Sequence, residues 1–279
     1  MRSETLKAAF ISLLLFAVFI GAWHMATLPK VSAAQAGANA EYAALMGKGA
    51  ERSGGFPPPA EVGAAFITHL SNPFYDRGPN DKGVGIQLGH SLVRVALGFL
   101  LAVLVAVPFG FAIGMSPLLL KAFDPFIQVL KPISPLAWMP LALYTLKDSS
   151  ISGIFVIFIC SVWPMLINTA FGVAAVRRDW INVARTLEVN PPRKVFLVIL
   201  PAAAPTILTG MRISMGIAWL VIVAAEMLVG GTGIGYFVWN EWNNLALPNV
   251  IFAIALIGLV GMLLDMIFRR LQELVTYRE

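Results

Sequence analysis

Six long apolar stretches interrupt the chain, and they limit its possible folds more than any other feature. A helix needs about 20 mostly apolar residues to cross the hydrocarbon layer of a membrane. The stretches cover residues 8–27, 91–114, 123–146, 151–176, 202–229 and 250–268. Of the 279 residues 58% are hydrophobic and only 13% charged, too few charges to cover a water-soluble protein. We therefore predict an all-α integral membrane protein with about six transmembrane helices.

The third stretch, residues 123–146, contains the prolines Pro132, Pro135 and Pro140. A proline inside a helix removes one backbone hydrogen bond and frees a carbonyl that lipid cannot satisfy. We therefore expect this helix to be kinked and packed inside protein.

The first stretch has two interpretations. Basic residues before it and a run of small residues at 31–36 resemble a cleaved signal peptide. Its apolar run is long for a signal peptide, however, and its removal would leave the two chain ends on opposite sides of the membrane. We favour a retained N-terminal anchor at residues 1–27, followed by an extracytoplasmic segment at 28–89 and a transmembrane domain at 90–279.

Lysine and arginine counts give the orientation, because short cytoplasmic loops of membrane proteins are enriched in both residues. With the N-terminus inside, the cytoplasmic segments contain Arg2, Lys7, Lys121, Arg177, Arg178, Arg185, Arg193, Lys194, Arg269, Arg270 and Arg278. The short outer loops contain only Lys147. We therefore predict a multi-pass protein of a bacterial inner membrane with both termini in the cytoplasm.

The outer segment divides into two parts. Its first part, up to Pro59, is rich in Ala, Gly and Pro and is expected to be loosely ordered. The second part, 61–89, contains an amphipathic stretch and then the turn-rich sequence from Asn72 to Gly78.

The sequence offers little for catalysis. It contains no Gly-x4-Gly-Lys-Ser/Thr stretch, and its histidines His24, His69 and His90 are scattered. The single cysteine, Cys160, lies in an apolar run and is expected to serve packing.

The basic residues border apolar runs, which is typical of membrane proteins and does not indicate nucleic-acid binding. We predict a protein that is not an enzyme and needs no cofactor, and we expect the glycines at 230–235 to form a tight outer turn.

The cytoplasmic loop at 177–201 is the most informative segment. Asp179 suits a helix N-cap, and Ile181, Ala184, Leu187 and Glu188 would share one helical face. The sequence Asn190-Pro191-Pro192 then ends the helix. Such a short amphipathic helix can rest on anionic lipid or dock into a soluble partner.

This loop resembles the signature of permease subunits of ATP-binding-cassette importers: Glu-Ala-Ala, three residues, Gly, nine residues and Ile-x-Leu-Pro. Here the positions are Asn182-Val183-Ala184, Glu188 and Val198-Ile199-Leu200-Pro201. Ala184, Leu200 and Pro201 are kept, whereas Asn182, Val183 and Glu188 depart from the pattern. With the glycine replaced, we expect Asn190, which tolerates a left-handed conformation, to supply the bend.

The resemblance covers nearly the whole chain after Pro57. It is strongest to the branch that imports nitrate, nitrite, bicarbonate, cyanate, sulfonates and taurine, through Ser91-Leu92-Val93-Arg94-Val95, residues 135–141, Gly210-Met211-Arg212 and Ala225-Glu226-Met227. Residues 72–78, 154–159, 163–170 and 226–231 resemble nitrate permeases in particular.

The resemblance implies a type I importer permease that works as a dimer. The partners it implies are a second copy of this chain, two cytoplasmic ATPase subunits, an extracytoplasmic substrate-binding protein and membrane lipid. It also implies that the loop is a coupling helix in a cleft of the ATPase. The residues expected to couple to it are Asp179, Ala184, Arg185, Thr186, Leu187, Glu188, Val189 and Asn190, with Leu187 as an apolar anchor and Arg185 as a rim charge.

Charged residues inside the spans have two interpretations. All of them, Arg94 and Asp265 included, could form stabilising pairs between helices, and Arg94 could also extend to the outer headgroups. Alternatively, an anion needs fixed positive charge or donors along its path. The candidates for such a path are Lys131, Trp138, Arg212 and Glu226. Lys131 could instead donate to the carbonyls that the prolines free.

Two other classes of protein compete with an importer subunit. An ion-coupled secondary carrier would act alone, and paired broken helices in two halves would indicate it, but the sequence does not contain them. A structural membrane protein would leave the cytoplasmic loop unexplained.

Overall fold

The computed structural model describes residues 2–28, 56–78 and 81–275. The helices in these ranges are α1 (Arg2–Ala26), α3 (Pro59–Ser71), α4 (Val84–Met115), α5 (Pro117–Leu130), the 3-10 helix η1 (Pro135–Trp138), α6 (Met139–Leu146), α7 (Ser149–Ala174), α8 (Arg178–Thr186), α9 (Pro191–Lys194), the π-helix η2 (Val195–Ile199), α10 (Leu200–Val229), α11 (Ile234–Asn243) and α12 (Leu247–Val275). Within the described ranges there is no β-strand beyond one isolated bridge, which confirms the all-α prediction. Most of the segment expected to be loosely ordered falls at 29–55, outside the described residues.

The chain divides into two compact units. Unit 1 contains Met1–Ser71 and Glu241–Phe252, and unit 2 contains Asn72–Asn240 and Ala253–Glu279. In unit 1 the Trp23 indole donates to the Pro57 carbonyl oxygen at 3.1 Å. Phe252 stacks on His69 and meets Phe66 edge to face. The 21-residue stretch Leu6–Ala26 of α1 is apolar enough to cross a membrane and has no buried residue, which suits a helix surrounded by lipid.

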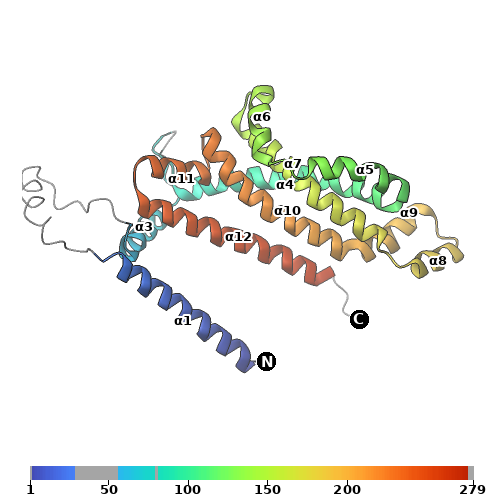
Figure 1. Cartoon of the computed structure of the whole chain (residues 1–279), viewed down its shortest axis with the longest axis horizontal. Coiled ribbons are helices and arrows are strands. Elements are labelled where there is room, and N and C mark those ends of the chain that lie inside the picture. The colour runs from blue at the N-terminus through green and yellow to red at the C-terminus, as the bar shows by residue number, and fades with distance from the viewer. Residues whose placement is uncertain (1, 29–55, 79–80, 276–279) are drawn as a thin grey trace, which may run out of the picture. The chain divides into compact units, whose positions relative to one another are not determined.

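Helices α4, α7 and α10 form the core of unit 2, and α7 packs against both of the others (Figure 1). Small residues lie where the helices touch: a Cβ on Gly98 would meet Ile157, and one on Gly110 would meet Thr169. Without a hydrophobic force between helices in lipid, such close backbone approach is what holds them together. Part of α12 joins them, because the Trp219 indole donates to the Ile257 carbonyl oxygen at 3.0 Å.

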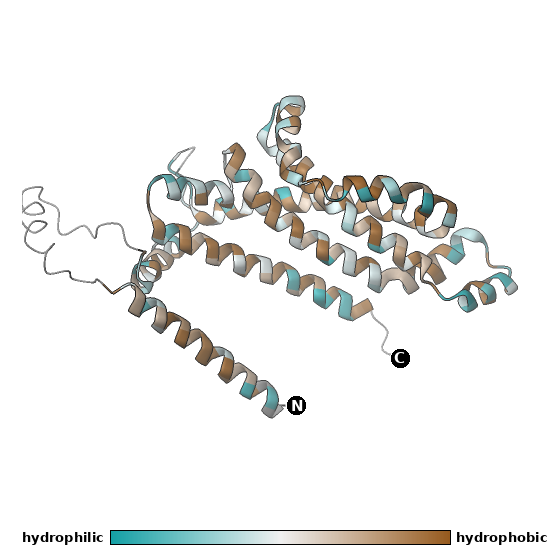
Figure 2. Ribbon diagram, in the orientation of Figure 1, coloured by the Kyte–Doolittle hydropathy of each residue, from teal (hydrophilic) through white to brown (hydrophobic). Residues whose placement is uncertain are grey.

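Within the described residues, five helices are long and apolar enough to cross a membrane: Leu6–Ala26, Val84–Met115, Ser149–Ala174, Pro191–Val229 and Leu247–Val275. The sixth predicted span is a bent pair, in which Pro117–Leu130 and Pro135–Leu146 meet at 83°. Brown, apolar residues run along these helices in Figure 2. The break between α5 and η1 includes Pro132, so the kink expected from the prolines is confirmed, and it is sharper than a bend within one helix. The expectation that this span packs inside protein does not hold for α5 within this single chain, because α5 has no buried residue.

The turn predicted at residues 72–78, before α4, is stabilised by a backbone hydrogen bond and an ion pair. The Tyr75 carbonyl accepts from Gly83 N–H at 2.7 Å, and the Lys82 ammonium lies 3.2 Å from the Asp76 carboxylate. The backbone N–H of Gly78, together with Lys82, lowers the pKa of Asp76. A charged carboxylate therefore helps to close this loop on the side where α4 begins.

Candidate functional site

The predicted cytoplasmic helix is present as α8, Arg178–Thr186. Figure 1 shows α8 and α9 together at one end of unit 2, with the turn between α10 and α11 at the other end. The N-cap is Arg177 and no side chain caps the helix, so the assignment of Asp179 as N-cap is wrong. Asp179 lies in the first turn instead, where its carboxylate favours the positive end of the helix dipole and lies 3.5 Å from Arg177.

The bend after α8 is made by Glu188. Its φ is +51°, in the left-handed region that favours glycine, whereas Asn190 has φ −54° and ψ 144°. The expectation that Asn190 supplies the bend is therefore wrong, and Glu188 takes the conformation of the glycine that it replaces. The turn closes with two backbone bonds, from Glu188 N–H to the Arg185 carbonyl and from Val189 N–H to the Ala184 carbonyl, each at 3.0 Å.

The apolar side of α8 is split between the protein interior and solvent. Ala184 is buried and Ile181 is half-buried. Leu187 is 70% exposed, and Trp180 and Val183, at the i, i+3, i+7 spacing with it, are also exposed. We call Trp180, Val183 and Leu187 the α8 outer face. Leu187 therefore does not share the buried side of Ala184 as the sequence predicted, and Trp180 and Val183, which were not predicted, lie on its side of the helix although their spacing indicates it.

The other predicted coupling residues surround this face. Arg185 and Thr186 are exposed, Val189 is half-buried and Asn190 is exposed. The Thr186 hydroxyl donates to the Asn182 carbonyl at 3.1 Å. The structure thus gathers the predicted residues into one surface element that can present apolar and charged groups together.

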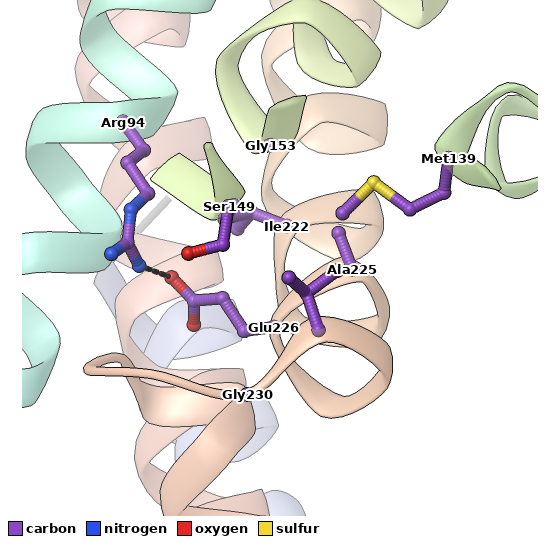
Figure 3. A pocket seen from close by; sticks show the side chains of 9 residues that line it. Arg94, Met139, Ser149, Gly153, Ile222, Ala225, Glu226 and Gly230 are labelled. Carbon is purple, nitrogen blue, oxygen red and sulfur yellow. Dashed lines mark hydrogen bonds and ion pairs between the residues drawn. The ribbon is translucent and has the colours of Figure 1, made fainter. Parts of the chain in front are cut away.

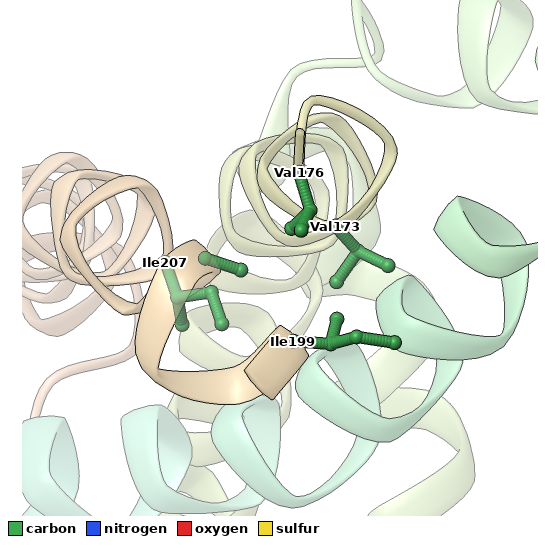
Figure 4. Packing of buried hydrophobic residues seen from close by; sticks show 5 residues of the cluster. Val173, Val176, Ile199 and Ile207 are labelled. Carbon is green, nitrogen blue, oxygen red and sulfur yellow. The ribbon is translucent and has the colours of Figure 1, made fainter. Parts of the chain in front are cut away.

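Buried aliphatic side chains connect α8 to the membrane helices. Val173, Val176, Ile199, Ala203 and Ile207 form one cluster, against which Ile181 also packs (Figure 4). Ile199 belongs to the π-helix η2, which joins α9 to α10. Ile181 of α8 is therefore in direct packing contact with side chains of α7 and α10.

A buried ion pair lies at the opposite end of unit 2. Arg94 of α4 donates from Nη1 to Glu226 Oε1 of α10 at 2.7 Å (Figure 3). It also donates to the Thr232 carbonyl and to the Ser150 hydroxyl. Arg94 therefore does not extend to the headgroups as the sequence suggested, and it joins three helices and a turn instead.

Glu226 is only 4% exposed and has several partners of its own. Ser91 Oγ lies 2.8 Å from Oε2, which also accepts from Gly235 N–H at 3.0 Å. The cavity beside the pair has a volume of about 10 Å3, room for about one water molecule. This geometry favours the interpretation of Glu226 as a structural partner of Arg94, and the glycine-rich segment folds over it as a turn with Gly230 and Gly231 at positive φ.

A second ion pair joins α10 to α12. Arg212 Nε donates to Asp265 Oδ1 at 2.6 Å and Nη2 donates to Oδ2 at 2.7 Å. The side chains are 35% and 53% exposed and face an open groove. Arg212 is a predicted residue of the anion path, and its partner is Asp265, which lies 53 residues away in the sequence and was predicted only as a member of some interhelical pair.

Lys131 and Trp138 lie on the two sides of the break in the bent pair. Lys131 is the C-cap of α5 and is exposed, and Trp138 is half-buried in η1. Among the described residues, no hydrogen bond or ion pair of the Lys131 ammonium is found. Donation to carbonyls freed by the prolines is therefore not seen, and the role of Lys131 in an anion path stays a prediction.

The coupling loop, the broken span and the packed helices invite comparison with transport proteins. The sequence profile of the binding-protein-dependent transport system inner membrane component matches residues 98–278, well over half of the chain. The chain belongs to this family. The resemblance to importer permeases of the nitrate, bicarbonate and taurine branch is thereby confirmed.

Relatives within the importer family are similar over most of the chain. The nitrate import permease protein NrtB of Synechocystis sp. is 45% identical over 80% of this chain and 81% of its own length. The bicarbonate transport system permease protein CmpB of the same organism is 45% identical over 79% and 80%. An inward-facing structure of the MetNI methionine transporter is 14% identical, with a TM-score of 0.59 over 68% of this chain and 94% of that one, and supports the type I permease fold.

Proposed function

We propose that this permease carries a small inorganic anion into the cell, and that separate subunits hydrolyse the ATP that drives transport. Nitrate or nitrite is the leading candidate for the anion. The observation that carries this proposal is α8, a helix outside the membrane bundle whose outer face exposes three apolar side chains. Proteins rarely leave an apolar helix face exposed to solvent. Because the apolar side chains of α8 are exposed among charged residues, they favour binding of a protein partner.

The complete transporter contains two copies of this chain, two ATPase subunits on the cytoplasmic side and a substrate-binding protein outside. Both termini lie in the cytoplasm, as the distribution of Lys and Arg predicts. Closure of the ATPases on ATP pushes α8, and the cluster around Ile199 passes that motion to α7 and α10.

Similarity to the nitrate permease and the four nitrate-like segments of the sequence favour nitrate as the cargo. Bicarbonate is the second candidate, because the bicarbonate permease is equally similar at 45% identity. Cyanate, sulfonates and taurine are further alternatives within the same branch.

The test is uptake of labelled nitrate in cells with and without this chain, followed by reconstitution with its ATPase and binding protein. We expect nitrate uptake that requires ATP and stops with vanadate. Uptake by this chain alone, driven by an ion gradient, would show a secondary carrier instead. Unchanged nitrate uptake with loss of bicarbonate uptake would assign the permease to the second candidate.

A further inference from the structure

One face of α10 forms an open groove beside α12. Thr209, Arg212, Ile213, Gly216, Ile217 and Leu220 line it from α10 at helical spacing, and Asp265 lines it from α12. Its volume is about 450 Å3, enough for a small anion with several waters. No atom lies within 4 Å of the position that a Cβ on Gly216 would take, so this stretch is open.

The charges in this groove are inside membrane-spanning helices. Arg212 follows Leu200 by twelve residues, about 18 Å along α10, and Asp265 lies one turn before Arg269 on α12. Charged groups at such positions avoid lipid and face either a water-filled space or protein. Since neither side chain of the pair is buried, we take its groove to be water-filled space within the span.

The geometry of the pair indicates which ligand suits the groove. Arg212 presents Nε and Nη2 as a planar fork, and both oxygens of Asp265 occupy it at 2.6 and 2.7 Å. A planar oxyanion offers a pair of oxygens in the same arrangement, which a guanidinium binds bidentately. We propose that this groove is a transit site for planar monovalent oxyanions such as nitrate or bicarbonate, bound by Arg212 in exchange for Asp265.

Asp265 acts in this site as an internal competitor. When the groove is empty, its carboxylate neutralises Arg212, so the cation is not left unpaired within the span. An arriving anion must displace that carboxylate and therefore binds weakly. Weak binding suits a transport path, because the ion has to leave as easily as it enters.

The first test detects anion binding by the melting temperature of the purified complex of this chain with its ATPase subunits. Nitrate, bicarbonate and chloride are the probes. Asp265→Asn removes the competitor and keeps a similar shape. We expect nitrate or bicarbonate, but not chloride at equal ionic strength, to raise the melting temperature of this variant by several degrees, and more than in the wild type. The double variant Arg212→Gln/Asp265→Asn should show no such shift. No shift in D265N, or an equal shift in the double variant, would overturn the site.

The second test measures transport of the same anions, and here the site rests on the proposed function. We expect Arg212→Gln/Asp265→Asn, which leaves no unpaired charge, to lower uptake at least tenfold while ATP hydrolysis continues. Arg270→Gln, an exposed arginine on α12 paired with Glu273, is the matched control and should transport normally. Normal uptake by the double variant would exclude the groove from the path.

The two proposals fail separately. If the wild-type complex transports bicarbonate and not nitrate, the cargo assignment changes while the planar-anion site stands. If the wild type transports neither anion but D265N binds one, the proposed function fails and the site remains as a binding site.

Discussion

The two ends of unit 2 both contain an arginine–carboxylate pair, but the pairs are built in opposite ways. At the end with the 230–235 turn, Arg94 and Glu226 are 11% and 4% exposed and share hydrogen bonds with Ser91, Ser150 and the turn backbone. Toward the end with α8, Arg212 and Asp265 bind only each other among the described residues and are 35% and 53% exposed. The Arg94–Glu226 pair connects several elements through its hydrogen bonds. The Arg212–Asp265 pair has no such additional partners among the described residues, so either side chain can exchange its partner.

The difference between the two ion pairs follows from how far their side chains are exposed to solvent. A buried charge that loses its partner keeps its desolvation penalty, so a buried pair holds its elements together. An exposed pair gains little net energy, since water replaces either partner at low cost. The groove with Arg212 and Asp265 and the α8 outer face are both exposed in this chain, so ligands and partners have access to each of them.

The largest effect is expected from breaking the buried pair. Arg94→Met leaves the Glu226 carboxylate buried without its cation, which should cost about 3–5 kcal/mol of unfolding free energy. Arg212→Met, the same change in the exposed pair, should lower the unfolding free energy far less. Thermal unfolding in detergent compares the two variants.

Arg94→Met/Glu226→Met serves as the control, because replacing both members of a buried pair removes the unpaired charge and should restore most of the stability. Equal losses for Arg94→Met and Arg212→Met would show that exposure does not distinguish the two ends.

The next effect concerns the α8 outer face. Leu187→Asp places a charge where the ATPase subunit is expected to bury an apolar side chain, and central interface residues typically contribute 2 kcal/mol or more. We expect co-purification of the ATPase to fall while the permease still inserts and melts as before. Arg185→Ala, a change at the rim, should leave the complex largely intact, and survival of the complex in both variants would place the docking face elsewhere.

The sequence predicted the helical class and the spans because the apolar runs are long enough to be read without tertiary contacts. It predicted the break at Pro132 and the position of α8 for similarly local reasons. Local patterns failed where a distant partner or an unfavoured conformation decided the outcome. Arg94 pairs with Glu226, which lies 132 residues further along the chain. Glu188 adopts a left-handed backbone conformation although it has a Cβ.

A smaller effect is expected at the glycines of the two ends. A Cβ on Gly235 would collide with the backbone carbonyl of Val223 and approach Glu226 Cβ, so Gly235→Ala should cost about 1–3 kcal/mol through overpacking. Gly216→Ala in the open groove should instead stabilise α10 by about 0.5–1 kcal/mol, because glycine weakens a helix interior. Melting temperatures in detergent measure both, and destabilisation by Gly216→Ala would show that the groove is occupied by packed protein.

The smallest effect concerns the left-handed residue after α8. Glu188 has φ +51°, which costs a residue with a Cβ about 1–2 kcal/mol, whereas glycine adopts this conformation freely but loses more entropy on folding. Glu188→Gly should therefore stabilise the turn by about 1 kcal/mol, seen as slower hydrogen exchange at the Val189 N–H that bonds Ala184. Glu188→Ala removes the carboxylate but keeps the Cβ and should give no gain, and Thr186→Gly inside α8 should speed exchange. If Glu188→Ala slows exchange as much as Glu188→Gly, charge and not backbone conformation limits the stability of this turn.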